Sequence, residues 1–294
     1  MKVGARCGYC LLHRGYMIIL RSTEDEGVRL KAVAELLKLL GDGFGPDAVP
    51  SYLGTERDRL IKRVTGCPDA YAEVKHLANE KALELLPRLE KMIEEARPEE
   101  RLRTAMRISC IGNVIEYDVP GHSSDIDEAL ERLGEGFCID DTEEFKRVAA
   151  PGSEVLLLAD NAGEIALDRL VVRELKQMGC RVTVAVKGGP SLNDALMGDA
   201  EKVGMTEEAT EVITTGTDAI GVRLEECSEE FRGRFNGADA IIAKGMANWE
   251  TLTEVPAPSP TLYLFMTKCE PVANSVGAPL NRCVAKLVPT GWRL

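Results

Sequence analysis

The chain lacks any apolar run that approaches the ~20 residues needed to cross a bilayer as a helix, so the sequence predicts no membrane span. It also lacks a recognisable secretory signal, because the apolar stretch Tyr16–Leu20 is short and is followed by Arg21. Basic residues are in deficit, with 36 Lys and Arg against 48 Asp and Glu. The resulting net charge of −12 argues against nucleic acid or an anionic membrane as the main partner. We therefore expect a soluble, cytoplasmic protein.

Several motifs of nucleotide-binding and hydrolytic enzymes are absent as well. No Gly-x-x-x-x-Gly-Lys-Ser/Thr occurs, which excludes a Walker-type phosphate loop. The segment Asp160-Asn-Ala-Gly163 has neither the Gly-x-Gly-x-x-Gly spacing of a dinucleotide fold nor the Asp-x-Asp pattern of haloacid-dehalogenase phosphatases. No Gly-x-Ser-x-Gly elbow appears, so an α/β-hydrolase nucleophile is not indicated.

Cysteine, in contrast, occurs nine times and is spread over the whole chain. An odd, scattered set is typical of free thiols in a reducing compartment. Cys7-Gly-Tyr-Cys10 forms a close pair. Together with Cys67 and Cys110, this pair could supply the four ligands of a zinc site. Three roles for the pair stay open at this point: structural thiols, a metal site or redox chemistry.

The hydrophobic pattern divides the chain into two regions. Residues 1–120 are expected to form an all-helical domain, which includes a long helical stretch, Ala70–Ala96, interrupted near Pro87. Residues 121–150 are rich in turn formers and are expected to link two domains. In residues 151–294, short apolar strands alternate with helices. This alternation predicts an α/β domain with a Rossmann-like, mostly parallel sheet and helices on both faces.

The expected strands of this second region are short apolar or β-branched runs. They are Val155–Ala159, Val182–Val186, Glu211–Thr214, Ala240–Ala243, Thr261–Met266 and Val284–Val288. One of the helices expected between them is Gly221–Phe235.

Polar residues collect where these strands end. They are Asp160 and Asn161 after the first strand, Lys187, Asn193 and Asp194 after the second, Asp218 after the third, Lys244 and Asn248 after the fourth, and Lys268 after the fifth. The carboxyl ends of parallel strands share one edge of the sheet, so these side chains are expected to meet in one crevice. Carboxylate and amide oxygens suit a hard divalent ion, and lysines suit a phosphoryl group. Asp160 and Asn161 could instead only cap the next helix, but capping needs one such residue.

These residues also resemble a known family, the metal-dependent damage-control phosphatases, formerly a domain of unknown function. The matching segments are Asp69-Ala-Tyr-Ala-Glu-Val-Lys75 with Asn79, Gly112-Asn113-Val-Ile-Glu-Tyr117, Asp160-Asn-Ala-Gly-Glu164, Val186-Lys-Gly-Gly-Pro190 with Asn193-Asp194, Gly216-Thr-Asp218 with Gly221, and Lys244-Gly-Met-Ala-Asn248-Trp-Glu250. They cover nearly the whole chain in the family's order. The Cys7-x-x-Cys10 pair resembles one prokaryotic branch.

The resemblance implies a divalent metal ion held by Asp160, Asn161 and Asp194, with Lys244 on the phosphate. Oxygen ligands favour magnesium, manganese, cobalt or nickel. Asp160, Asp194 and Lys244 are then the expected catalytic residues, and a small phosphorylated metabolite is the expected substrate, a sugar phosphate or a phosphopantetheine-like ester. The expected substrate contacts are Asn113, Asp218, Lys244 and Asn248. The oligomeric state is not predicted.

Two alternatives remain from other classes of function. One is a carboxyl methyltransferase that uses S-adenosylmethionine, although its usual glycine-rich Asp/Glu-x-Gly-x-Gly is absent. The other is a metal- or metabolite-binding protein without turnover.

Overall fold

The computed structural model describes residues 1–112 and 133–294. Asn113 and residues 121–132 of the expected linker lie outside the described residues. Within the described part, no helix combines the length and the apolar character needed to cross a membrane.

Seven strands form one sheet in the order β1-β7-β6-β5-β2-β3-β4. Their bounds are β1 Phe137–Asp140, β2 Glu154–Leu158, β3 Arg181–Val186, β4 Glu211–Thr214, β5 Ala240–Lys244, β6 Thr261–Met266 and β7 Cys283–Val288. Every neighbouring pair is parallel except β6 and β7. All six expected strands are present, and the mostly parallel α/β fold is confirmed. The seventh strand, β1, lies in the segment 121–150, which was expected to be only a linker.

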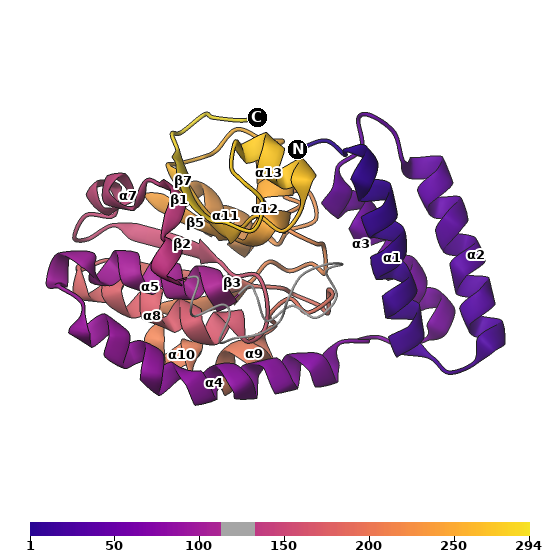
Figure 1. Ribbon diagram of the computed structural model, residues 1–294, viewed down its shortest axis with the longest axis horizontal. Coiled ribbons are helices and arrows are strands. Elements are labelled where there is room, and N and C mark those ends of the chain that lie inside the picture. The colour runs from indigo at the N-terminus through magenta and orange to yellow at the C-terminus, as the bar shows by residue number, and fades with distance from the viewer. Residues whose placement is uncertain (113–132) are drawn as a thin grey trace.

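Helices cover both faces of this sheet (Figure 1). On one face, α4 (Ala72–Glu95), α5 (Arg101–Gly112) and α8 (Glu164–Gln177) share a core with alternate residues of β2, β3, β5 and β6. On the other face lie α11 (Glu229–Gly237), α12 (Gly245–Leu252) and α13 (Glu270–Val276). The central strands β5 and β6 are buried along their whole length because both of their faces are covered. The remaining short helices are η1 Pro98–Glu100, η2 Leu133–Glu135, α7 Thr142–Val148, α9 Met197–Lys202 and α10 Met205–Glu208.

The first three helices form a separate bundle at one end of the molecule (Figure 1). They are α1 (Ala5–Ser22), α2 (Glu26–Gly43) and α3 (Pro50–Thr65), and they enclose a core of their own. Because α4 and α5 pack on the sheet, the helices of region 1–112 are divided between this bundle and the α/β part. Leu192 and Ile220, from loops of the sheet, complete the bundle core and attach the bundle to the α/β part.

Two local expectations are also wrong. Pro87 lies inside α4 and does not interrupt it; the helix keeps one buried face, which includes Leu86 and Leu89 on either side of the proline. The expected helix Gly221–Phe235 begins only at Glu229, where Ser228 caps it by accepting a hydrogen bond from the Phe231 N–H. The helix does not begin at Gly221, because Gly221 has φ +67°, which is not a helical conformation. Gly221 also lies so close to α12 that an added Cβ would be 2.5 Å from the Ala247 carbonyl oxygen.

The strand order places a topological switch point between β2 and β5. From β2 the chain proceeds outward through β3 and β4, then crosses back to β5 on the other side of β2. Ligands of open α/β sheets bind at the carboxyl ends of the strands at such a point. Here the switch point brings the loop after β2, with Asp160 and Asn161, against the start of α12.

Candidate active site

Two loops carry the oxygen-bearing residues, and backbone hydrogen bonds join them. The N–H of Ala162 donates to the Asn193 carbonyl at 2.8 Å, and the N–H of Ala195 donates to the Asp160 carbonyl at 2.8 Å. Asn161 and Asp194 face each other across an isolated β-bridge. The side chains of Asp160, Asn161 and Asp194 are thus brought together from β2 and β3, as the sequence predicts for their positions.

Asp160 occupies a space that only a glycine can leave open. A Cβ at Gly245, the first residue of α12, would lie 2.1 Å from the Asp160 carboxylate. Gly245 also has φ +76°, a conformation that side chains disfavour. The Asn161 amide donates to the Asp160 carboxylate at 3.1 Å, which leaves the amide oxygen as the other donor atom of that side chain. Gly245 therefore leaves the space that the Asp160 carboxylate occupies at the switch point.

A cavity of about 140 Å³ opens beside these residues, between the sheet edge and the helical bundle. The sheet side contributes Asp160, Asn161, Leu192, Asn193, Asp194, Ile220, Met246, Ala247, Glu250, Lys268, Cys269 and Pro271. The bundle side contributes Arg6, Cys7, Tyr9, Cys10, Leu11, Arg14, Pro50, Ser51, Gly54 and Arg57. The wall is therefore largely apolar, with a few charged side chains, which is the usual character of a small-molecule site.

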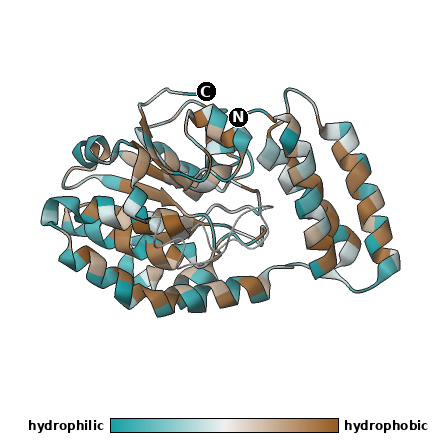
Figure 2. Ribbon diagram, viewed as in Figure 1, coloured by the Kyte–Doolittle hydropathy of each residue, from teal (hydrophilic) through white to brown (hydrophobic). Residues whose placement is uncertain are grey.

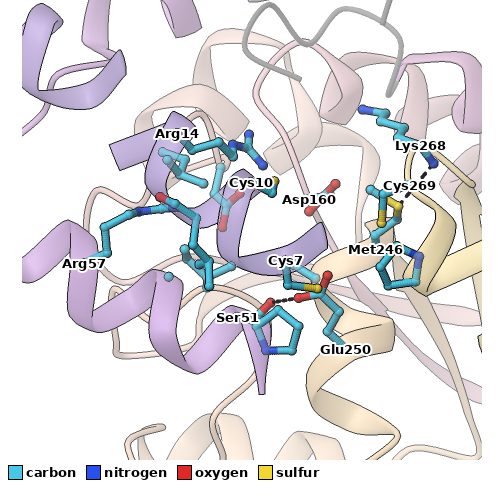
Figure 3. A pocket seen from close by; sticks show the side chains of 18 of the residues that line it. Cys7, Cys10, Arg14, Ser51, Arg57, Asp160, Met246, Glu250, Lys268 and Cys269 are labelled. Atoms are coloured by element: carbon cyan, nitrogen blue, oxygen red, sulfur yellow. Dashed lines mark hydrogen bonds between the residues drawn. The ribbon is translucent and has the colours of Figure 1, made fainter. Parts of the chain in front are cut away.

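The charged side chains lie around Asp160 in the close view of this cavity (Figure 3). Arg14 approaches from α1, whereas Lys268 approaches from the end of β6 on the opposite side. Lys187 stands behind Asp194, where its ammonium lies 3.6 Å from the carboxylate and also donates to the Gly221 carbonyl. Cations thus flank both acids of the oxygen cluster, an arrangement that suits an anionic ligand.

Glu250 supplies a third carboxylate to the cavity. It accepts a hydrogen bond at 2.5 Å from the Ser51 hydroxyl, which belongs to α3 of the bundle. Burial raises the pKa of Glu250 above its ordinary value, and the Ser51 hydrogen bond opposes this rise. A carboxyl whose pKa is raised by burial holds its proton more tightly than a solvated one, a property that acid–base groups of enzymes share.

Lys244 does not line this cavity. Its side chain is 0% exposed, and its ammonium binds Glu164 and Asp168 of α8, the latter at 2.8 Å. It also donates to the Ser109 carbonyl of α5 at 3.4 Å. Burial would lower the pKa of Lys244, but the carboxylates of Asp168 and Glu164 outweigh it and raise this pKa. Lys244 therefore joins α5, α8 and β5 beneath Asp160, and in this arrangement its ammonium faces the protein interior.

Two other expected substrate contacts also lie away from the cavity wall. Asp218 is bound by Arg59 at 2.7 Å and by Lys62 at 3.0 Å, both from α3. Burial acts to raise the pKa of Asp218, but these two cations outweigh it and lower the pKa. Asn248 is buried in α12 and donates to the Lys244 carbonyl at 2.7 Å. Asp218 thus connects the bundle to the loop after β4, and Asn248 connects the first turn of α12 to β5. Asn113, the third contact, lies outside the described residues.

The cysteines do not assemble a zinc site. Cys7 and Cys10 line the cavity, whereas Cys110 is buried beside Cys283 and Cys67 lines another cavity. In the described ranges, no group of three or more His, Cys, Asp and Glu side chains is placed to hold a metal ion. The cluster of Asp160, Asn161 and Asp194 is of a different kind, because one of its three members is an amide. Burial raises the pKa of the Cys7 thiol, which favours its neutral form.

Sequence reasoning missed the bundle side of the cavity. Arg14, Ser51 and Arg57 lie more than a hundred residues before Asp160, and no motif spacing relates them to it. Glu250 and Lys268 had a detectable signal, since both follow strands of the sheet. Only the docking of α1 and α3 on the sheet edge shows that these five residues share one cavity.

Comparison with known proteins agrees with this arrangement. Residues 3–284 match the family described as "Damage-control phosphatase ARMT1-like domain". A damage-control phosphatase of Archaeoglobus fulgidus is 36% identical over 292 residues, which cover 98% of this chain and all of the relative. A damage-control phosphatase of Pyrococcus horikoshii is 31% identical over 286 residues, which cover 97% of each chain.

The fold agrees equally well. The crystal structure of a DUF89 family protein from Pyrococcus horikoshii superposes with a TM-score of 0.87 at 30% sequence identity, covering 97% of this chain and 98% of that one. Sequence and fold therefore match along almost the entire length, including the strand ends that form the cavity. These relatives support a phosphatase role, and the chain belongs to the ARMT1-like damage-control phosphatase family.

Proposed function

We propose that the protein is a divalent-metal-dependent phosphatase that hydrolyses a small phosphorylated metabolite. The observation that carries this proposal is the cluster of Asp160, Asn161 and Asp194 at the switch point, flanked by Lys268 in a mostly apolar cavity. Its relatives named damage-control phosphatases support the reaction class. A sugar phosphate or a phosphopantetheine-like ester is the substrate class that we propose.

The donor set fits a hard or borderline divalent ion. Asp160, Asn161 and Asp194 offer carboxylate and amide oxygens, the ligands that magnesium and manganese prefer. The seat at Gly245 fixes one carboxylate, and the backbone bonds between the two loops fix the other two side chains. When bound, such an ion polarises the phosphoryl group and lowers the pKa of a coordinated water.

Residues of the chain would do the remaining work. Lys268 would stabilise the charge on the phosphoryl oxygens, in place of the buried Lys244, because its side chain lines the cavity opposite Arg14. Glu250 would accept a proton during hydrolysis, since its carboxyl lies partly buried in the cavity wall and is hydrogen-bonded to Ser51. The apolar part of the wall would hold the alcohol portion of the substrate and exclude water.

The test is a screen of phosphorylated metabolites for phosphate release, with magnesium, manganese, cobalt and nickel supplied one at a time. We expect turnover with at least one ion, loss of turnover on chelation, and recovery when the ion is restored. Ser191→Ala is a matched control for variants in the loop after β3, such as Asp194→Asn. Ser191 is buried near Asp194 but does not line the cavity. Methyl transfer from S-adenosylmethionine without any phosphate release would overturn the proposal.

A further inference from the structure

Exposed hydrophobic side chains are concentrated on α1, on α2 and at the end of α2. Eight large hydrophobic residues are exposed in the described part of the chain, and five of them lie between residues 9 and 44. These five are Tyr9, Tyr16, Leu30, Leu37 and Phe44, and we call them the outer face. Leu30 and Leu37 are 64% and 52% exposed. A single exposed leucine needs no explanation, but a group of exposed hydrophobic residues is typical of an interaction site. Figure 2 shows hydrophobic residues recurring along α1 and α2.

The outer face consists of two rows that lie side by side. Its members on each helix are seven residues apart, and this spacing keeps them on one side of a helix. The ring of Phe44 lies over Gly8, where an added Cβ would meet it at 3.5 Å, so Phe44 adjoins Tyr9. About two turns further along α1, Gly15 packs against Leu36, so the next residues of the two helices, Tyr16 and Leu37, lie at the same level. The two rows therefore form one continuous apolar strip.

Most of this strip is separate from the active site. Tyr9 borders both, because it lines the cavity together with Arg6, Cys7, Cys10, Leu11 and Arg14 of α1. The other four members, Tyr16, Leu30, Leu37 and Phe44, do not line the cavity. Changes at Leu30 and Leu37 can therefore be made without touching the cavity wall.

A row of charges runs along α2 next to the apolar strip. Its members are Lys31, Glu35, Lys38 and Asp42, spaced by four, three and four residues. In the part of the chain that the structure describes, none of these four forms an intrachain ion pair. Their signs alternate, so the row read backwards is opposite in sign to the row read forwards. Two antiparallel copies would place Lys31 against Asp42 and Glu35 against Lys38.

We propose that the outer face binds a second copy of this chain, with the two α2 helices antiparallel about a twofold axis near Leu37. A twofold interface uses the same patch on both subunits, and a self-complementary charge row is what such a patch requires. The apolar strip supplies the buried centre of the interface, and the charge row sets its direction. The active sites remain open, because Leu30 and Leu37 at the centre of the interface do not line the cavity.

Sedimentation velocity and light scattering over the micromolar range test this assignment. Wild-type protein should be a dimer, and the double variant Leu30→Glu with Leu37→Glu should be a monomer, with the dissociation constant raised about 100-fold or more. Leu77→Glu is the matched control, because Leu77 is 54% exposed on α4, away from the outer face, and this variant should stay dimeric. Circular dichroism should show an unchanged fold in all three.

A charge exchange distinguishes a second copy from any other partner. Lys38→Glu and Glu35→Lys should each weaken the dimer, because each variant places like charges opposite one another. An equimolar mixture of these two variants should dimerise again, because one subunit then carries only acids and the other only lysines at these positions. A monomeric wild type, a dimer unaffected by Leu30→Glu with Leu37→Glu, or a mixture that stays monomeric would each overturn the proposal. None of these readouts depends on phosphatase activity.

Discussion

Replacing Lys244 by Met should destabilise the protein rather than act on the chemistry alone. The Lys244 ammonium is fully buried and is held by Glu164 and Asp168, which are buried as well. Methionine keeps the apolar stem but removes the charge, so Glu164 and Asp168 would remain in the core without their cation. Removing one partner of a buried ion pair costs about 3–5 kcal/mol of unfolding free energy. This is a large part of the about 5–15 kcal/mol that stabilises a folded protein.

The measurement is urea unfolding followed by circular dichroism, with the slope against urea compared between variants. A triple variant, Lys244→Met with Glu164→Gln and Asp168→Asn, replaces both acidic partners as well and should regain most of the lost stability. Phosphate release should be measured on both variants under conditions in which each is folded. If Lys244→Met instead keeps the wild-type unfolding free energy and only turnover falls, Lys244 contacts the phosphate, and the reasoning from its burial is wrong.

Three further predictions concern the cavity, and a fourth concerns the buried Glu164 of α8. Asp194→Asn should lower both metal affinity in calorimetry and phosphate release, because it keeps the shape of a proposed ligand and removes its charge; unchanged metal affinity would exclude Asp194 as a ligand. Lys268→Met should lower kcat/KM by about 10²-fold with metal affinity unchanged, since a lysine stabilises the phosphoryl charge without binding the ion; wild-type turnover would contradict this role. Cys7→Ser with Cys10→Ser should raise KM more than it lowers kcat, because both thiols form cavity wall; an equal loss in kcat would point to a chemical role. In metal-free protein, burial raises the pKa of Glu164 from 4.5 to about 8. The folded state then holds a proton that the unfolded state releases, so unfolding free energy should fall as pH rises towards 8, by up to about 1.4 kcal/mol per pH unit, and Glu164→Gln should flatten this dependence.

The strands of the sheet could be predicted because their signal is local. β5 and β6 are apolar runs buried on both faces, and each ends abruptly at a charged or polar residue. β1 was missed for the opposite reason, since Phe137–Asp140 is an edge strand, short and half-exposed, with no apolar run to mark it.

The role of a polar residue depends on partners that the local sequence does not reveal. Lys244 and Lys268 both follow strands and resemble each other in sequence context. One is neutralised by Glu164 and Asp168 from α8, and the other lines the cavity. Strand ends therefore predicted where the site lies, and only the packing of the helices separates an interior lysine from one that faces a ligand.

The division of the cavity between two bodies has a consequence for how its specificity can change. At the sheet edge, a side chain at Gly245 would collide with the Asp160 carboxylate. Substitutions at these two positions are therefore expected to disrupt the oxygen cluster. The opposite half is formed by α1 and α3, whose residues Arg14, Ser51 and Arg57 belong to a bundle with its own core. Mutations there can reshape the wall without disturbing the oxygen cluster. An engineer seeking a new substrate should therefore randomise the bundle and leave the sheet edge untouched.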